Sequence, residues 1–401
     1  MVGSFKTILD STTNIITRNP RVQERFDLPY LLRRDPADWR GAEGSLALCK
    51  LMSLDNDMYD VKMPSLEGKA WAGANRDWVV YIEYNCEWEL VNVYTRHRVP
   101  LPKISDDCPE VEYTGILREF KYDHGDCRLQ KIAICRVPNR YWDYSNYEVV
   151  AIFDKLVAFL TSTPRWILLK NQFRYTDEYY DAIQYEGLVF AATTRGTVFA
   201  WNRHAFGPVN IPPPILLNFY NQGGDDDADH HEHEDELDPY TQWRLATYSD
   251  GSPLLVCIQG TTDVTKEAGV ISHGRTLRTY SNIRCRVFGM GTSVLAPTPS
   301  PWFSIESLGG NSLFLGQNYP MMVEGDPAAV DTTLLPFMRS KCIYTSDIAM
   351  LPYRPNMGPD IGRFSLDDQS CVGLKIDNSW PFPENHFWFK ARVSNAGEWL
   401  S

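Results

Sequence analysis

Short apolar runs separated by turn residues recur along the chain and predict β-hairpins. One hairpin is expected where residues 78–82 (Trp-Val-Val-Tyr-Ile) and residues 88–94 lie on either side of a polar Asn-Cys-Glu turn. Another is expected where residues 187–192 and 197–201 flank a turn that ends at Gly196. A tight turn of this kind needs a positive φ, which glycine adopts without steric cost.

The same alternation continues through the second half of the chain. Residues 244–249 and 254–258 flank Asp250-Gly251, a strong signal for a hairpin turn. Further apolar runs follow at residues 312–315, 342–344 and 362–366. The pattern predicts an all-β chain of many short strands, which agrees with 21 Tyr, 18 Phe and 12 Trp beside 26 Gly and 26 Pro.

Residues 149–160 carry a pattern that also fits a helix. Apolar side chains stand at positions 149, 152, 153, 156, 157 and 160, the spacing of an amphipathic helix. We predict instead a hairpin of residues 149–153 and 156–160 that turns at Asp154-Lys155, because both flanks are rich in strand-forming residues.

Hairpins a few tens of residues apart are typical of propeller blades, whose repeats run about 40 to 50 residues. We expect a kelch-like β-propeller over residues 28–390, preceded by an N-terminal extension at residues 1–27. The ~340 residues outside this extension and one acidic insertion would hold about seven blades, with six as the alternative. No WD or kelch signature recurs at a fixed period, so this expectation rests on the hairpins.

The net charge of −12 is concentrated in one segment. Between Asp225 and Asp238 lie six Asp and three Glu with no Lys or Arg, which leaves −3 for the rest of the chain. Because like charges repel and carboxylates bury no apolar area, we expect residues 223–238 to form a disordered acidic and His-rich loop within the propeller. The nearly neutral remainder has no field to hold a polyanion, so no nucleic-acid partner is expected.

The chain carries no pattern typical of secretion or membrane insertion. Residues 1–10 lack a basic start and an apolar stretch, and no 18-residue apolar run follows. The nine cysteines include no Cys-x-x-Cys pair, and we expect them to be reduced and mostly buried. A cytoplasmic or nuclear protein with no membrane partner is expected.

Candidate catalytic and metal-binding patterns are each better explained as structure. His230-His231-x-His233 could bind a borderline metal, but a disordered tract has no surrounding groups to fix ligand geometry, so a solvated linker is favoured. Ser312 follows Gly310-Asn like the start of a nucleophile elbow, yet the closing glycine is missing, and a strand start is favoured.

Gly289-Met-Gly291 lacks the further glycine of a phosphate loop, and a plain turn is favoured. The remaining histidines have no partner spacing: His97, His124, His204, His273 and His386. No catalytic, cofactor-binding or metal-binding residue is assigned, and no cofactor is expected.

Four tryptophans at the ends of apolar runs allow two interpretations. Exposed Trp is common at interface hot spots, but packing between blades is more frequent, and we favour packing. The four are Trp166, Trp201, Trp243 and Trp302. No binding residue is therefore assigned from the sequence.

Three groups of segments follow one another in a characteristic order. The first holds Trp71-Ala-Gly, Leu90-Val-Asn-Val-Tyr94 and Val99-Pro-Leu-Pro102. The second holds Trp166-Ile-Leu-Leu, Asp181-Ala-Ile-x-Tyr-x-Gly187, Phe190-Ala and Gly196-Thr-Val-Phe-Ala-Trp201. The third holds Tyr248-Ser-Asp-Gly-Ser-Pro-Leu-Leu-Val, Arg286-Val-Phe, Trp302-Phe-Ser-Ile-Glu-Ser-Leu-Gly-Gly-Asn-Ser-Leu-Phe-Leu-Gly316 and Lys341-Cys-Ile-Tyr344. Over roughly residues 28–370 the chain resembles the plant F-box-associated propeller family of unknown function, the KIB type.

The resemblance implies a propeller that selects a protein for ubiquitylation while an N-terminal F-box binds Skp1 in a cullin-based ligase of the SCF type. Residues 1–40 include Leu28-Pro-Tyr-Leu-Leu32 and Trp39-Arg40 but no recognisable F-box. Skp1 and cullin are therefore expected as partners only if an F-box is supplied.

We expect a non-enzymatic module that binds a protein target, still unknown, through loops with a few aromatic and Arg anchors. The alternative is an enzyme that turns over a small molecule in the central pocket of the propeller, since fold alone does not exclude catalysis. A third alternative is a relic with no selected partner.

Overall fold

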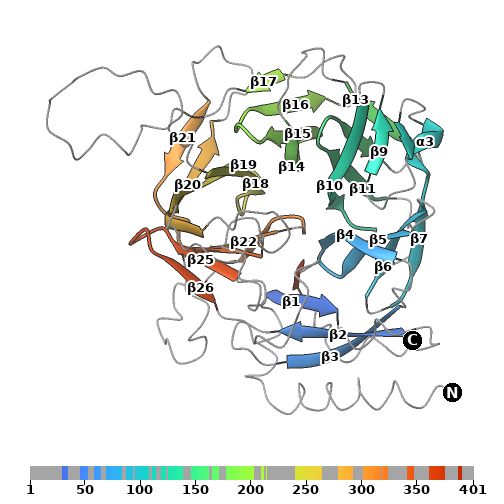
Figure 1. Ribbon diagram of the computed structural model, residues 1–401, viewed down its shortest axis with the longest axis horizontal. Helices are drawn as coiled ribbons and strands as arrows, with labels where there is room; N and C mark the ends of the chain where they lie inside the picture. The colour runs from blue at the N-terminus through green and yellow to red at the C-terminus, as the bar shows by residue number, and fades with distance from the viewer. Residues whose placement is uncertain are drawn as a thin grey trace, which may run out of the picture.

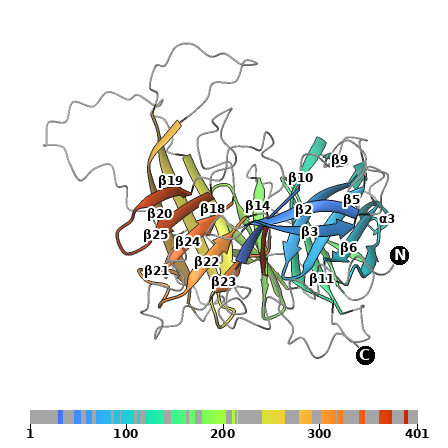
Figure 2. The ribbon, with the colours of Figure 1, turned by 90° about the horizontal axis from the view of Figure 1, so that it is seen from below.

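The structure is a computed structural model in which β-strands form a ring of sheets (Figure 1). It describes residues 29–34, 46–52, 58–64, 69–83, 87–93, 95–107, 111–113, 119–122, 125–138, 146–161, 165–170, 178–202, 209–211, 214, 240–263, 279–291, 301–316, 318–323, 341–346, 361–374 and 387–390. Figure 2 shows the ring from its edge, with β19 and β20 on one side and β5 and β6 on the other. The expected extension at residues 1–27 and the acidic loop at residues 223–238 lie outside the described residues.

The first sheet joins the two ends of the described chain. Its strands, in the order β27-β1-β2-β3, are β1 (Pro29–Arg34), β2 (Leu46–Met52), β3 (Met58–Pro64) and β27 (Phe387–Lys390). β27 pairs antiparallel with β1, with Leu32 opposite Phe387. This pairing closes the ring and removes a gap that would otherwise expose strand edges.

Four further sheets are antiparallel throughout. The second sheet contains β4 (Lys69–Asn75), β5 (Trp78–Glu83), β6 (Trp88–Asn92) and β7 (Arg98–Leu101), and a short helix, α3 (Ile104–Asp107), follows it. The third contains β8 (Val111–Tyr113), β9 (Glu119–Tyr122), β10 (Gly125–Arg136), β11 (Glu148–Phe153), β12 (Val157–Leu160) and β13 (Trp166–Leu169). The fourth contains β14 (Tyr179–Tyr185), β15 (Leu188–Thr193), β16 (Val198–Asn202) and β17 (Val209–Ile211). The fifth contains β18 (Tyr240–Thr247), β19 (Pro253–Asp263), β20 (Thr279–Met290) and β21 (Trp302–Ile305).

The last sheet departs from the blade pattern. Its order is β23-β22-β24-β25-β26, and β22 pairs parallel with β24. The strands are β22 (Ser312–Leu315), β23 (Met321–Val323), β24 (Cys342–Thr345), β25 (Ile361–Ser365) and β26 (Cys371–Leu374). The fold is thus an all-β propeller, as predicted, with five regular antiparallel blades and one irregular sheet.

The expected count of about seven blades, with six as the alternative, is therefore wrong. The third sheet occupies residues 111–169 and the fifth occupies residues 240–305. Both use more chain than the repeat of about 40 to 50 residues on which the count was based. Strands of twelve residues, β10 and β20, account for part of the difference.

The predicted hairpins are confirmed, including the ambiguous one. β11 pairs antiparallel with β12, so residues 149–160 form strands and not a helix. Every residue of both strands is buried. Because each blade packs between two others, these strands are apolar on both faces, and the period of two that normally identifies a strand is lost.

The hydrophobic core consists of layers between consecutive blades. Val80 and Leu90 pack with Ile132 and Val149 between the second and third sheets. Similar layers join the third sheet to the fourth, the fourth to the fifth, and the fifth to the irregular sheet. Each fully buried aliphatic side chain contributes about 1.5–3 kcal/mol relative to exposure, so these layers hold the ring together.

Gly73 of β4 is required by the close approach of two blades. A Cβ at this position would overlap the carbonyl oxygen of Ile132 on β10. We expect Gly73→Ala to lower the free energy of unfolding by at least about 2 kcal/mol, because backbone must move to admit the methyl group. Urea denaturation checks this. Gly291→Ala is the control, since its added Cβ would meet only Pro301 O at 3.5 Å; equal stability of both variants would contradict the packing argument.

Cys257 makes the core sensitive to alkaline pH. Burial raises its pKa to about 12 from an ordinary value of 9.0, while Arg286 opposes the shift. Above pH 9.0 the unfolded thiol loses its proton and the folded one keeps it, so stability falls as pH rises toward 12. We expect Cys257→Ala to reduce that loss by up to about 1.4 kcal/mol per pH unit. Denaturation at pH 8, 9, 10 and 11 checks it, and Val256→Ala, which removes no titrating group, should leave the pH slope unchanged.

Candidate functional site

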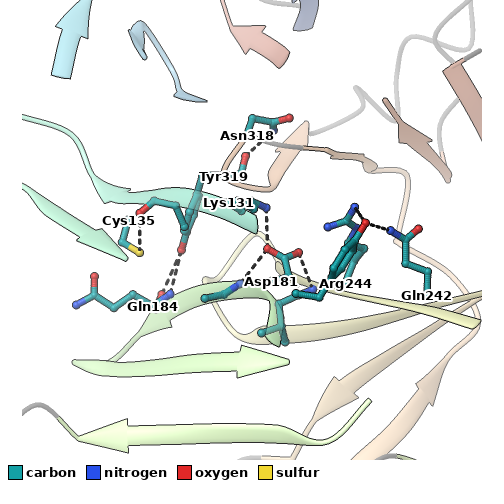
Figure 3. A network of polar contacts seen from close by, with 12 residues as sticks. Lys131, Cys135, Asp181, Gln184, Gln242, Arg244, Asn318 and Tyr319 are labelled. Atoms are coloured by element: carbon teal, nitrogen blue, oxygen red, sulfur yellow. Dashed lines mark hydrogen bonds and ion pairs between the residues drawn. The ribbon is translucent and has the colours of Figure 1, made fainter. Parts of the chain in front are cut away.

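Inner strands of neighbouring sheets lie side by side around the centre of the ring. β4 contacts β27 and β10, β14 contacts β10 and β18, and β18 contacts β23. β10 reaches this position with residues 129–136, because β9 pairs only with its first residues, Gly125–Arg128. Polar side chains from β10, β14 and β18 meet here and form the candidate site (Figure 3).

Asp181 is the centre of this network. Its Oδ1 accepts hydrogen bonds from Lys131 Nζ at 2.7 Å and from the backbone N of Ala182 at 2.9 Å. Its Oδ2 accepts one from the backbone N of Leu245 at 3.1 Å. The Lys131 and Asp181 side chains are only 2% and 1% exposed. One carboxylate therefore connects the inner strands of three blades.

Arg244 extends the network on β18. Its guanidinium carbon lies 4.0 Å from the centroid of the Tyr180 ring, and its Nη2 donates to Tyr180 Oη at 3.0 Å. Gln242 Nε2 donates to the same oxygen at 2.6 Å. Arg244 and Gln242 are buried, so these contacts replace water that both side chains lose on folding.

β-bulges re-aim the polar residues that β10 and β14 contribute to the network. The register of β14 shifts between Tyr179 and Asp181, which leaves Tyr180 as the extra residue. The register of β10 shifts between Leu129 and Lys131 and again between Ile134 and Arg136. A bulge locally re-aims the side chains beside it, and here it allows charged residues within apolar strands to meet.

Tyr319 joins blades that are not neighbours. Its backbone N donates to Ala74 O on β4 at 2.7 Å. Its hydroxyl donates to Gln184 O at 3.3 Å and accepts from Gln184 N at 3.4 Å, both on β14. Asn318, which is buried, donates from Nδ2 to Tyr319 O at 2.6 Å. The segment between β22 and β23 therefore reaches the inner strands β4 and β14.

Burial decides the protonation of the central groups. It lowers the pKa of Lys131, opposed by Asp181 and reinforced by Arg244. It raises the pKa of the Cys135 thiol and of the Tyr319 hydroxyl. The thiol and the phenol are thus held as weak nucleophiles, and the lysine and aspartate are bonded to each other. These hydrogen bonds hold neighbouring blades together.

The four tryptophans are buried in the layers between blades, which confirms the packing interpretation. Trp166 Nε1 donates to Pro102 O at 2.8 Å, and Trp201 Nε1 donates to Lys170 O at 3.2 Å. Trp243 packs beside Gly196, where a Cβ would overlap its ring. Trp302 lies in the same layer as Trp243.

The other sequence candidates have structural positions or are not described. Ser312 is buried and starts β22, as predicted. Gly289 lies within β20 under Phe303, so a plain turn was wrong there, and Gly291 follows the strand. His97 is partly buried with its ring edge-on to Trp78. The other histidines lie outside the described residues: His124, His204, His230, His231, His233, His273 and His386.

Sequence analysis missed Lys131, Asp181 and Arg244. Each is a charged residue with an apolar or aromatic neighbour in its strand, as in Leu129-Gln-Lys-Ile-Ala-Ile134. Burying such a charge costs free energy unless it is paired, so a charged residue in a buried strand indicates a partner on another strand. The strand partners that would pair them could not be read from the chain.

Five described cysteines, Cys135, Cys257, Cys285, Cys342 and Cys371, are free thiols, in agreement with the reduced state expected. Within the described ranges no group of three or more His, Cys, Asp or Glu side chains is placed to hold a metal ion. The part of the chain covered by the structure also contains no helix with the length and apolar character to span a bilayer.

The Lys131–Asp181 pair can be tested by removing its charge on one side. We expect Asp181→Asn to lower the free energy of unfolding by about 3–5 kcal/mol at neutral pH, because a buried ammonium loses its carboxylate. The penalty should shrink as pH rises, since the lowered pKa of Lys131 lets the amine become neutral. Chemical denaturation across pH checks both effects. Adding Lys131→Met should recover part of the loss; no recovery would contradict the pairing.

Comparison with known proteins supplies a family. The model of the KIB1-4 beta-propeller family matches residues 50–365. No curated protein matches. Among solved structures, a β-propeller domain of Cps50 (Swd1) from Myceliophteria thermophila is 9% identical over 86% of this chain and 85% of that chain, with a TM-score of 0.33, too low to bear on this protein. Since the family match covers most of the chain and agrees with the ring of sheets, the chain belongs to the KIB1-4 β-propeller family.

Proposed function

We propose that this propeller is a protein-interaction module without a catalytic role. The observation that carries the proposal is where polar groups are buried and where they are exposed. They are buried at the centre of the ring and exposed in turns at the ends of the strands. At the centre Lys131, Asp181 and Arg244 are buried and bonded between blades. At the turns after the inner strands, Arg76, Glu186 and Asp250 are exposed. The exposed turns are thus rigidly presented and available to a partner.

A place in ubiquitin ligation is the finer part of the proposal. Resemblance to F-box-associated propellers supports a role in selecting a protein for an SCF-type ligase. In that arrangement the propeller binds the target and an F-box, supplied with it, binds Skp1 and cullin. The cytoplasm or nucleus would be the compartment for this activity.

Partner capture with a structural readout tests this function. The tagged full chain is used to purify proteins from plant-type extract, with and without added Skp1, and the complex is compared with the free chain by hydrogen exchange. We expect a bound protein and slower exchange at residues 76–77, 95–97, 186–187 and 249–252. Fusion of an F-box should add Skp1 and cullin to the complex and increase ubiquitylation of the partner.

Asp181→Asn is a useful control, because it weakens the ring without altering the exposed turns. At a temperature where it is still folded, it should capture the same partner as the unchanged chain. Slower hydrogen exchange only in outer strands such as β7 and β13 would overturn the proposed function. Turnover of a small molecule with no captured protein would also overturn it.

A further inference from the structure

One face of the ring is defined by the ends of its inner strands. Gly73 and Asn75 of β4 lie beside Ile132 and Ile134 of β10 in the same order. Asp181 contacts Leu245, and Tyr185 packs near Gly251, so β14 and β18 also run in parallel. Tyr319 relates the two pairs, because it bonds to Ala74 near the end of β4 and to Gln184 near the end of β14. The residues that follow these four strands therefore emerge on a common face, which we call the turn face.

Arginine occupies two turn positions on the second blade where glycine or asparagine is favoured. Arg76 has a φ of 54° and Arg96 a φ of 60°. A non-glycine residue in this left-handed region is uncommon. Arg76 is exposed and Arg96 is partly exposed. Both residues lie in turns of the second blade that open on the turn face.

Hydrogen bonds of buried residues hold these two turns together. Asn92 Nδ2 donates to Asp77 Oδ2 at 3.0 Å, and both residues are buried. Val93 N donates to Asp77 O at 2.9 Å, and Arg96 N donates to Asn92 O at 2.8 Å. The backbone that carries Arg76 and Arg96 is thus fixed before any partner binds, which lowers the entropy cost of binding.

A third arginine stands on the adjoining blade. Asn75 Nδ2 donates to Ile134 O at 2.6 Å, which places the end of β4 beside the end of β10. Arg136 ends β10, and its side chain is 54% exposed. Its Nη1 donates to Asn146 Oδ1 at 3.1 Å and its Nη2 lies 3.6 Å from Glu148 Oε2. These contacts orient the guanidinium at the surface. Arg76, Arg96 and Arg136 together are called the arginine rim.

The opposite side of the turn face carries carboxylates. Glu186 and Asp250 are exposed in the equivalent turns of the fourth and fifth blades. Asp250 is held by a hydrogen bond from Ser252 N to its Oδ1 at 2.8 Å. Among its described residues, the turn face therefore carries Arg on the second and third blades and carboxylates on the fourth and fifth, and this division favours one orientation of a charged partner.

We propose that the arginine rim is the docking site for an acidic segment, rich in Asp and Glu, of the protein that this propeller recognises. The inference rests on the proposed function and adds the chemistry of the partner. Arginine binds carboxylates through paired donors. The three arginines come from two turns and one strand end on two blades, so they match carboxylates spread along a peptide better than one compact phosphate group. The nearly neutral charge outside the acidic tract disfavours a long polyanion such as nucleic acid.

Fluorescence anisotropy with the full chain tests the arginine rim. The probe is a labelled peptide of alternating Glu and Ser, and the neutral comparison is the same peptide with Gln. We expect binding to the Glu peptide alone, and weaker binding as NaCl rises from about 50 to 300 mM, because surface charges are screened. The double variant Arg76→Gln/Arg136→Gln should weaken binding by about tenfold, since each exposed pair contributes modestly.

The matched control is Glu186→Gln/Asp250→Asn, which removes two charges from the other side of the same face. It should bind the Glu peptide at least as tightly as the unchanged chain, and thermal unfolding should show that both double variants are folded. Equal weakening by both double variants, or binding of the Gln peptide, would overturn the site. Tighter binding of a peptide with a single phosphoserine, or of single-stranded DNA, would overturn the acidic segment as occupant.

The two proposals can fail separately. Capture of a partner from extract together with no binding of the Glu peptide would refute the arginine rim and leave the interaction module standing. Binding of the Glu peptide by a chain that captures no protein would refute the interaction module in its proposed form.

Discussion

Closing a ring of blades brings the edges of the innermost strands together at the centre, where their backbone N–H and C=O groups lose water. An unpaired group of this kind is costly, and most other features of the molecule follow from how the cost is avoided. Asp181 accepts from the edge of β18, Asn75 donates to the edge of β10, and Tyr319 bonds to both β4 and β14. Side chains and the backbone N–H of Tyr319 thus supply at the centre hydrogen bonds that neighbouring strands supply elsewhere.

This requirement also explains why charge lies in the interior. Asp181 serves two backbone N–H groups and Lys131 with two oxygens, which a neutral side chain of the same size could not do with equal strength. The carboxylate then needs a nearby cation, and Lys131 supplies it. The polar groups of the centre are used to hold blades together, and the proposed interaction surface therefore lies at the turns that end the strands.

Local features of this fold were predictable to the extent that neighbouring residues decide them. The turn at Gly196 and the turn at Asp250-Gly251 were correct because positive φ is a local requirement, and both glycines have it, at 82° and 90°. The hairpin at residues 149–160 was harder, because burial on both faces removed its alternation. The blade count was wrong because long strands and the parallel pairing of β22 with β24 leave no regular mark in the sequence.

The sequence by itself determined the strands, the turns, the all-β class and the resemblance to a propeller family, because side-chain shape and backbone preference act over a few residues. Only the tertiary structure decided that Lys131, Asp181 and Arg244 meet, and that Arg76, Arg96 and Arg136 share one face. These residues are separated by long stretches of chain, and their proximity depends on the closure of the ring and on bulges that shift the strand register. Contact between distant residues is a property of the closed ring, and the stability of the centre and the charges gathered on the turn face both depend on it.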